Sequence, residues 1–201
     1  MSFTQDLFTQ RRNYEDGNVR IGQLDRIWYD EHRNAFYIGD GTTPGGKPIS
    51  GGGWCGGFFD TTTQTISNVS LGYTVGINST TVSNGVSIDN NEIVFAYSGK
   101  YEITFSLQFQ NSDNTRQNID IWFQKNGVNI PDSNSQFSVA NDTAGKLGKL
   151  IAVTPFLDEF VAGDRITLKW RADDVAVQLV TQAAYDGVPR TPSVIITVKQ
   201  V

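Results

Sequence analysis

The sequence predicts an all-β protein, and three observations lead to that prediction. Aromatic and aliphatic residues occupy every second position from Tyr101 to Phe109, which is typical of a strand with one face in a core. Twenty glycines occur among 201 residues, with abundant Thr, Asn, Ser and Val, as expected for strands joined by tight turns. No segment keeps a helical spacing of apolar residues over three turns. Roughly nine or ten short strands separated by turns predict a β-sandwich.

Residues 1–50 are expected to form a separate N-terminal segment. Short strands are predicted at Val19–Ile21, Arg26–Tyr29 and Ala35–Ile38, and the last one leads into a loop of small residues, Gly39–Gly46. So few apolar positions can scarcely bury a core within one chain. The segment is therefore either a flexible tether or a module that completes its core against further copies of itself.

A glycine-rich linker is predicted at residues 51–57 and a head domain at residues 58–201. Gly99–Gln110 and Asn118–Lys125 are the clearest strands of the head, and the latter ends in an Asn126-Gly127 hairpin turn. Further strands are expected at Phe58–Thr62, Val86–Ile88, Ile93–Tyr97, Gln136–Ala140, Leu147–Phe156, Arg165–Arg171, Ala176–Gln182 and Ser193–Val201.

The core of the head should contain the alternating residues of the first clear strand. These are expected to face either Ile121 and Phe123 or Ile119 and Trp122 across the sandwich. The members of the alternating set are Tyr101, Ile103, Phe105, Leu107 and Phe109.

The composition argues against several classes of protein. A net charge of −5 is unlike the basic surface of a nucleic-acid-binding protein, and no run of about 18 apolar residues is present to insert into a membrane. The first residues lack the apolar core of a signal peptide, so we expect the protein not to be secreted and to remain in the cytosol where it is made. A single cysteine, Cys55, excludes an intrachain disulfide, and a single histidine, His32, leaves little scope for histidine-based zinc or triad chemistry.

Pairs of adjacent carboxylates are the remaining candidates for catalysis: Asp30-Glu31, Asp158-Glu159 and Asp173-Asp174. A glycoside hydrolase needs two carboxylates about 5–10 Å apart in one cleft, whereas adjacent residues of a strand point to opposite faces. We therefore predict that the protein is not an enzyme and binds no cofactor. A glycan depolymerase is the less favoured alternative.

Two loops are candidate sites for an ion. The Gly39–Gly46 loop lacks the helix N-terminus of a phosphate loop, and its Lys47 precedes a proline, so we interpret it as a structural turn. Asp113, with Asn111 and Asn114, offers oxygens that suit calcium, but no spacing enforces such a site. A polar turn is the favoured interpretation, and no metal site is predicted.

Four segments of the head carry a resemblance to a known family: Gly99–Phe105, Ile119–Gly127, Ala162–Leu168 and Ser193–Val198. These segments resemble strands of the jelly roll of the tumour necrosis factor and complement globular-head superfamily. In chain order they contain the motif Gly-x-Tyr-x-Ile-x-Phe, a strand ending in Lys-Asn-Gly, the motif Gly-Asp-x-Ile-x-Leu, and a final apolar strand. The resemblance implies a jelly-roll sandwich of about ten strands, a homotrimer, and a last strand at the three-fold axis. No collagen-like stalk is present.

The stretch Ala35–Gly46, AFYIGDGTTPGG, resembles an element of bacteriophage fibre and tropism proteins, where it belongs to small intertwined trimeric β-prism units. Together the two resemblances imply a homotrimeric virion protein of a tailed phage. The expected function is a structural and adhesive one, in a short fibre or spike whose head binds the host surface. A capsid decoration protein is the alternative, and the lack of a signal peptide disfavours a secreted cytokine-like ligand.

The last strand supplies the predicted trimer interface, namely Val194, Ile195, Ile196 and Thr197. Val194 and Ile196 alternate with Ile195 and Thr197, so the strand is apolar on both faces. A sandwich strand has no reason to expose an isoleucine on its second face unless another subunit covers it.

Two further sets of residues are candidate contacts with partners. Phe3, Leu7, Phe8, Arg11 and Arg12 are expected to dock the N-terminal tail onto other virion proteins, although a tail of this composition is also typical of a disordered end.

Tyr185, Asp186 and Arg190 lie in a loop of small residues. An aromatic ring flanked by charged groups suits a glycan or protein on the host surface, so these three are the predicted receptor-binding residues.

Overall fold

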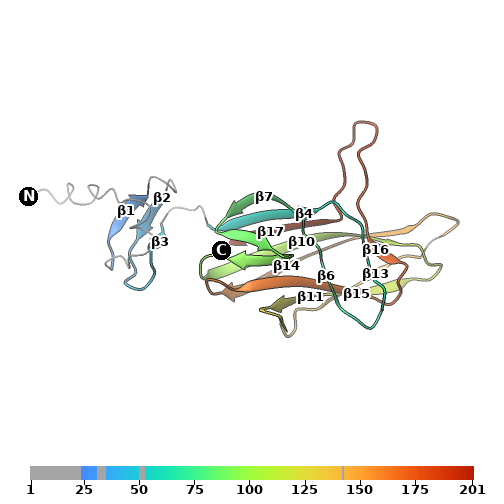
Figure 1. Ribbon diagram of the computed structural model, residues 1–201, viewed down its shortest axis with the longest axis horizontal. Helices are drawn as coiled ribbons and strands as arrows, with labels where there is room; N and C mark the ends of the chain where they lie inside the picture. Colours follow the sequence, from blue (N-terminus) through green and yellow to red (C-terminus); the bar gives the residue numbers. More distant parts are fainter. Residues whose placement is uncertain (1–23, 31–34, 50–52, 142) are drawn as a thin grey trace, which may run out of the picture. The chain divides into compact units, whose positions relative to one another are not determined.

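The structure is a computed structural model that describes residues 24–30, 35–49, 53–141 and 143–201. Its contacts divide the chain into two units, Met1–Gly53 and Trp54–Val201. The regular elements of the described residues are all β-strands, paired antiparallel (Figure 1). The predicted all-β class and sandwich-like architecture are thus confirmed. The described ranges contain no helix of the length and apolarity needed to cross a membrane.

The first unit contains a three-stranded sheet in the order β1 (Ile27–Asp30), β2 (Ala35–Ile38) and β3 (Lys47–Pro48). The two strands predicted from Arg26 and Ala35 are confirmed, whereas the one predicted at Val19–Ile21 lies outside the described residues.

Alternation along β1 and β2 gives this small sheet two different faces. Trp28 and Tyr37 are paired across the strands and buried, with their rings stacked 6.2 Å apart. On the other face Tyr29 pairs with Phe36, and both side chains are exposed.

The second unit contains two seven-stranded sheets (Figure 1). In the first, β14 (Gly148–Phe160) pairs with one edge of β10 (Gly99–Asn111) along its whole length. On the other side of β10 lie β17 (Val194–Gln200) and then β4 (Cys55–Asp60). The short or outer members of this sheet are β5 (Gln64–Thr65), β7 (Ser79–Asn84) and β16 (Val177–Leu179).

The second sheet is centred on β11 (Gln117–Lys125) and β15 (Arg165–Ala172), which pair over seven residues. Beyond β15 come β9 (Glu92–Phe95) and β8 (Val86–Asp89). The members that flank this centre are β6 (Tyr73–Thr74), β12 (Val128–Asn129) and β13 (Ser135–Val139). Asn126 and Gly127 both have positive φ between β11 and β12, as a two-residue hairpin turn requires.

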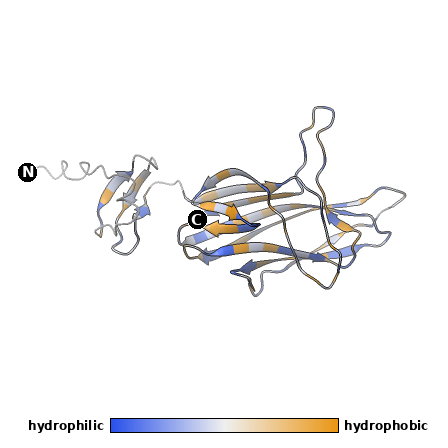
Figure 2. Cartoon of the chain, viewed as in Figure 1, coloured by the Kyte–Doolittle hydropathy of each residue, from blue (hydrophilic) through white to orange (hydrophobic). Residues whose placement is uncertain are grey.

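The core lies between the two sheets, and hydrophobic and hydrophilic residues alternate along its strands (Figure 2). All five predicted core residues of β10, from Tyr101 to Phe109, are at most 1% exposed. Across the core, Phe105 lies 6.1 Å from Phe123 between ring centroids. Ile119, Ile121 and Phe123 are buried, whereas Trp122 lies on the opposite face of β11. The first of the two expected alternatives, Ile121 and Phe123, is thus confirmed, and the second is wrong for Trp122.

The sandwich begins earlier than predicted, because Cys55, Gly56 and Gly57 form the first half of β4 rather than a linker. Close packing explains their small size. A Cβ atom at Gly56 would lie 2.4 Å from the Phe58 ring, and one at Gly57 would lie 2.6 Å from Oγ1 of Thr81.

Candidate functional site

The last strand, β17, separates the four predicted interface residues into two pairs. Val194 and Ile196 are buried in the core of their own chain, opposite the strand's exposed face. Ile195, with 42% of its surface exposed, and Thr197 point outward. Only these two are placed where another molecule can touch them.

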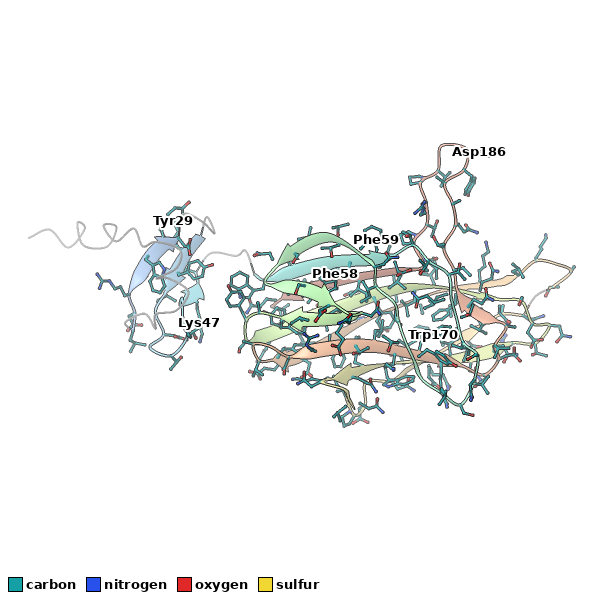
Figure 3. The ribbon with its side chains drawn as sticks, viewed as in Figure 1. Tyr29, Lys47, Phe58, Phe59, Trp170 and Asp186 are labelled. Carbon is teal, nitrogen blue, oxygen red and sulfur yellow. The ribbon has the colours of Figure 1, made fainter. Side chains whose placement is uncertain are left out.

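The surface around Ile195 is a largely uncharged face, in which apolar side chains of β14, β17 and β4 flank polar ones of β10. We call it the β14/β17 face. Ser106 on β10 pairs with Val153 on one side and Ile195 on the other, and Ile195 pairs in turn with Phe59. Because directly paired residues point to the same side of a sheet, these side chains form one row. Phe58 is the neighbour of Phe59 on β4, and consecutive residues of a strand point to opposite faces. Phe58 is accordingly buried in the core, whereas Phe59 belongs to the outer row (Figure 3).

The edge strand β14 contributes most of the exposed apolar side chains of this face. Ile151, Val153 and Leu157 are 59%, 52% and 61% exposed, and Pro155 lies between the last two. These residues were not among those predicted from the sequence to form the interface. The signal was present, since Leu150 to Val153 are four consecutive apolar residues, which place apolar side chains on both faces of a strand.

Charged groups lie at the margin of the β14/β17 face. The row that contains Leu157 also contains Glu102 and Lys199, whose side chains form an ion pair of 3.0 Å. The two rows centred on Ser106 and Thr104 contain no charged residue between β14 and β4. The centre of the face is thus uncharged and available for a dry contact.

The predicted receptor-binding residues lie on a hairpin that projects from the sandwich between β16 and β17, with Asp186 at its tip (Figure 3). Tyr185 and Val188 exchange backbone hydrogen bonds of 3.1 and 2.7 Å, and Asp186 and Gly187 have positive φ. Tyr185 and Asp186 are both exposed on this hairpin. Arg190 is also exposed, but no ion pair joins it to Asp186 among the described residues.

The Gly39–Gly46 loop is organised around the Asp40 carboxylate. It accepts hydrogen bonds from the backbone N–H groups of Thr42 (3.0 Å) and Thr43 (2.6 Å), and Lys47 forms an ion pair with it at 3.2 Å. The side-chain and backbone hydrogen bonds from Thr43 hold the pKa of Asp40 far below its ordinary value. These N–H donors are occupied by Asp40, which supports the interpretation of the loop as a structural turn.

Gly46 shows why this loop needs glycine. Its φ is +71°, and a Cβ atom there would lie 2.4 Å from the Trp28 indole and 2.7 Å from the carbonyl oxygen of Ile38. Any other residue would be strained and would displace the buried indole.

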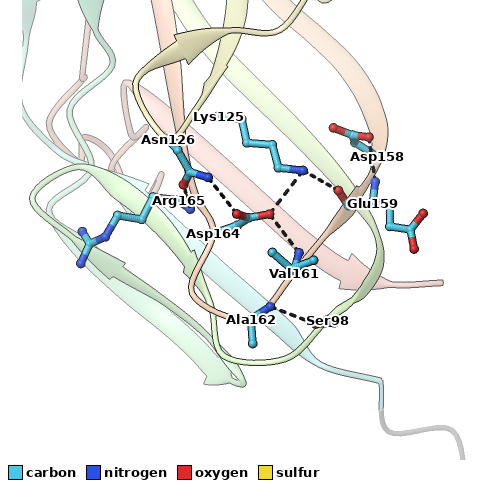
Figure 4. A network of polar contacts seen from close by, with 9 residues as sticks. All are labelled: Ser98, Lys125, Asn126, Asp158, Glu159, Val161, Ala162, Asp164 and Arg165. Carbon is cyan, nitrogen blue, oxygen red and sulfur yellow. Dashed lines mark hydrogen bonds and ion pairs between the residues drawn. The ribbon is translucent and has the colours of Figure 1, made fainter. Parts of the chain in front are cut away.

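A polar network joins two of the motifs that carry the jelly-roll resemblance (Figure 4). Asp164 accepts hydrogen bonds from Nδ2 of Asn126 (2.8 Å) and the Val161 N–H (2.9 Å), and it pairs with Nζ of Lys125 at 3.3 Å. Burial acts to raise the pKa of Asp164, but these three partners outweigh it and lower the pKa. The Lys-Asn-Gly turn and the Gly-Asp turn are therefore one structural unit.

The Asp113 loop is likewise held by its own hydrogen bonds. Asp113 accepts from the Thr115 hydroxyl and from Nε2 of Gln117 (2.6 Å), while its own N–H donates to Oδ1 of Asn111 (2.9 Å). In the part of the chain that the structure describes, no three His, Cys, Asp or Glu side chains cluster as metal ligands would.

The proposed attachment residues Phe3, Leu7, Phe8, Arg11 and Arg12 lie outside the described residues, as does His32. No protein-family model matches the chain, and a search of curated proteins found no match either. The geometry of the described surfaces therefore has to distinguish the candidate functions.

Proposed function

We propose that the protein is a homotrimeric structural and adhesive component of a bacteriophage particle, a short fibre or spike whose head binds the host surface. The observation that carries this proposal is the β14/β17 face. A solvated face of an antiparallel sheet normally carries polar residues, and an exposed apolar face on a long edge strand is prone to self-association. Two further copies of the chain are the partners that would cover it.

The order of the strands supports a jelly roll. One sheet runs β14-β10-β17-β4, and the other runs β8-β9-β15-β11 with β13 beyond β11. This interleaving of strands from both ends of the sequence is the arrangement expected of the superfamily that the head resembles. In that superfamily the last strand lies at the trimer axis, and here the last strand, β17, contributes Ile195 to the apolar face.

The N-terminal unit supports self-association independently of the head. Its β1–β2 face exposes Ile27, Tyr29 and Phe36, and Tyr29 and Phe36 lie 5.1 Å apart between ring centroids. The third strand of this sheet has only two residues, and so few apolar positions bury little core within one chain. Burying these rings among three chains would complete the core. The phage-type AFYIGDGTTPGG element lies in this same unit.

The Tyr185 hairpin and the point where the N-terminal segment joins the head lie at opposite ends of β4. The chain joins the sandwich at Trp54, next to Cys55 at the start of β4. The Tyr185 hairpin precedes Val194, which pairs with Asp60 at the opposite end of β4. A strand of six residues spans about 20 Å, so the hairpin is displaced by that distance from the point where the N-terminal segment connects.

Electron microscopy of phage particles labelled with a gold-conjugated antibody against the head tests this assignment. Label on the tail supports a fibre or spike. Label distributed over the capsid would mean that the protein is a capsid decoration and not a fibre or spike. Particles without label would overturn the virion assignment. Incubation of the purified protein with host polysaccharide should release no reducing ends, whereas their release would indicate a depolymerase.

A further inference from the structure

A groove of about 430 Å³ opens on the outer face of the second sheet, on the side of the sandwich away from the β14/β17 face. Its lining includes Trp122 and Asp120 from β11, Arg171 from β15, and Asn129, Asp132 and Asn134 from the segment after β11. Pockets that take small ligands typically measure about 300–1,000 Å³ and combine an apolar surface with a few placed polar groups. The groove meets both criteria.

Trp122 supplies a fixed aromatic surface in this groove. Its Nε1–H donates to Oδ1 of Asn129 at 2.8 Å, and Gly72 packs so closely that a Cβ atom there would lie 2.5 Å from the indole. The ring is thus restrained along the edge that carries Nε1, Cζ2 and Cη2, and it remains partly exposed. The three other tryptophans of the chain, Trp28, Trp54 and Trp170, are buried.

Asp120 and Arg171 form a preorganised charged pair beside the indole. Oδ2 of Asp120 accepts from Nε of Arg171 at 2.9 Å, and Oδ1 accepts from Nδ2 of Asn134 at 3.0 Å. Burial acts to raise the pKa of Asp120, but these hydrogen bonds and the Arg171 charge lower it overall. The carboxylate therefore stays ionised at neutral pH and fixes the guanidinium.

Several hydrogen-bonding groups in the groove remain unused. Arg171 has five N–H donors, and only the one on Nε is bonded within the described residues. The Asp132 carboxylate is exposed and accepts no hydrogen bond from the described residues. A ligand with neighbouring hydroxyl groups can accept from Arg171 and donate to Asp132 at once.

The balance of charge argues for a neutral ligand. The lining contains two carboxylates, Asp120 and Asp132, and one guanidinium. Lys169 pairs with Trp122 across the strands, but its Nζ donates to Thr74 at 3.0 Å. The groove thus has no excess of positive charge that would attract a phosphate or an acidic sugar.

We infer that this groove is a binding site for a neutral saccharide, with one sugar ring stacked on Trp122 and its hydroxyl groups bonded to Arg171 and Asp132. An indole presents the apolar face that the C–H side of a sugar ring covers, and the surrounding groups match the hydroxyls. The inference rests on the proposed adhesive function for its biological role. The groove stays open in the proposed trimer because it lies on the sheet opposite the one that would be buried.

Fluorescence of the full-length protein gives a direct test, because Trp122 is the tryptophan that a ligand in the groove would touch. The protein is titrated with glucose, galactose, mannose, N-acetylglucosamine and N-acetylgalactosamine, and in parallel with glucuronic and N-acetylneuraminic acids. We expect a saturable change in emission with at least one neutral sugar, confirmed by calorimetry. A response confined to the acidic sugars, or no response to any, would overturn the inference.

Variants assign the binding to the groove. W122A should weaken the affinity measured by calorimetry at least about tenfold. Asp132 has a φ of 59°, which asparagine tolerates better than alanine, so the second variant is D132N. It removes the charge of an exposed side chain that has no partner among the described residues, and it should weaken the affinity severalfold while preserving the fold. Y185A on the projecting hairpin is the matched control and should bind as the wild type does. If Y185A lost affinity for the sugar and W122A did not, the binding site would be on the hairpin and not in the groove. The trimer and its place in the virion are measured separately, so failure of the groove leaves the proposed function standing.

Discussion

At the scale of single residues, the sandwich depends on a few large side chains that meet in the core. Phe105 is 1% exposed, pairs with Ile196 on β17, and lies 6.1 Å from Phe123 between ring centroids. Truncation of such a side chain removes its transfer free energy and leaves a cavity.

Phe105→Ala should therefore lower the free energy of unfolding by about 3–5 kcal/mol. Denaturant unfolding followed by tryptophan fluorescence measures this change. Tyr185→Ala, at an exposed hairpin position, should change it by less than about 0.5 kcal/mol. A melting temperature for Phe105→Ala within a degree or two of the wild type would contradict the placement of β10 in the core.

Asp164 gives a prediction about pH. Its pKa is lowered in the folded state, so its contribution to stability is present above its unfolded pKa and is lost as the pH falls through its folded pKa. Asp164→Asn should cost about 1–3 kcal/mol at pH 7, and the difference from the wild type should shrink below about pH 4. A difference that stays constant from pH 7 to pH 3 would show that the carboxylate charge is not what stabilises this turn.

Among the elements, strands with a regular alternation of apolar and polar residues were predicted well, and strands without it were missed or misplaced. β10 and the hydrophobic side of β17 follow a strict alternation that only a half-buried strand explains. β7, Ser79–Asn84, was missed because its side chains are largely polar and exposed at the edge of a sheet. β4 was predicted to begin three residues too far along the chain, at Phe58 and not at Cys55. The reason is that Gly56 and Gly57, which close packing requires, look like a linker in the sequence.

The groove could not be predicted, because its residues come together only through pairing across the second sheet. Asp120 lies opposite Arg171 on β15 and Gln136 on β13, positions far apart in the sequence. The alternation of Ile119, Ile121 and Phe123 does place Trp122 outside the core, and that signal was available in the sequence. What the sequence lacks is the register that sets Arg171 beside it.

The β14/β17 face carries the prediction about assembly. Ile195→Asp and Val153→Asp each place a charge in the uncharged centre of the face, where desolvation would oppose contact with another chain. Each variant should shift the protein from trimer to monomer in sedimentation while its circular dichroism spectrum stays unchanged. Val128→Asp, on exposed β12 of the second sheet, is the control and should leave the mass of the trimer unaltered. If only this control dissociated, the interface would lie on the second sheet and not on the β14/β17 face.

At the scale of the whole molecule, the two units have different expected roles. Trp54 is buried and its ring stacks 3.9 Å from that of Tyr97, so a chain that begins at Gly51 retains every described residue of the sandwich. We expect this shortened chain to form a trimeric head that is not incorporated into particles. Normal incorporation, measured by immunoblotting of purified virions, would mean that the head is itself the attachment surface.

The central claim is that three copies of the chain cover one another's β14/β17 faces. Sedimentation equilibrium of the full-length protein at micromolar concentration tests it most directly, because an obligate interface of this kind typically buries more than about 2,000 Å² and does not dissociate on dilution to that range. We predict a single species with three times the 22.2 kDa mass of the chain. A single species of 22.2 kDa at the same concentration would contradict the account.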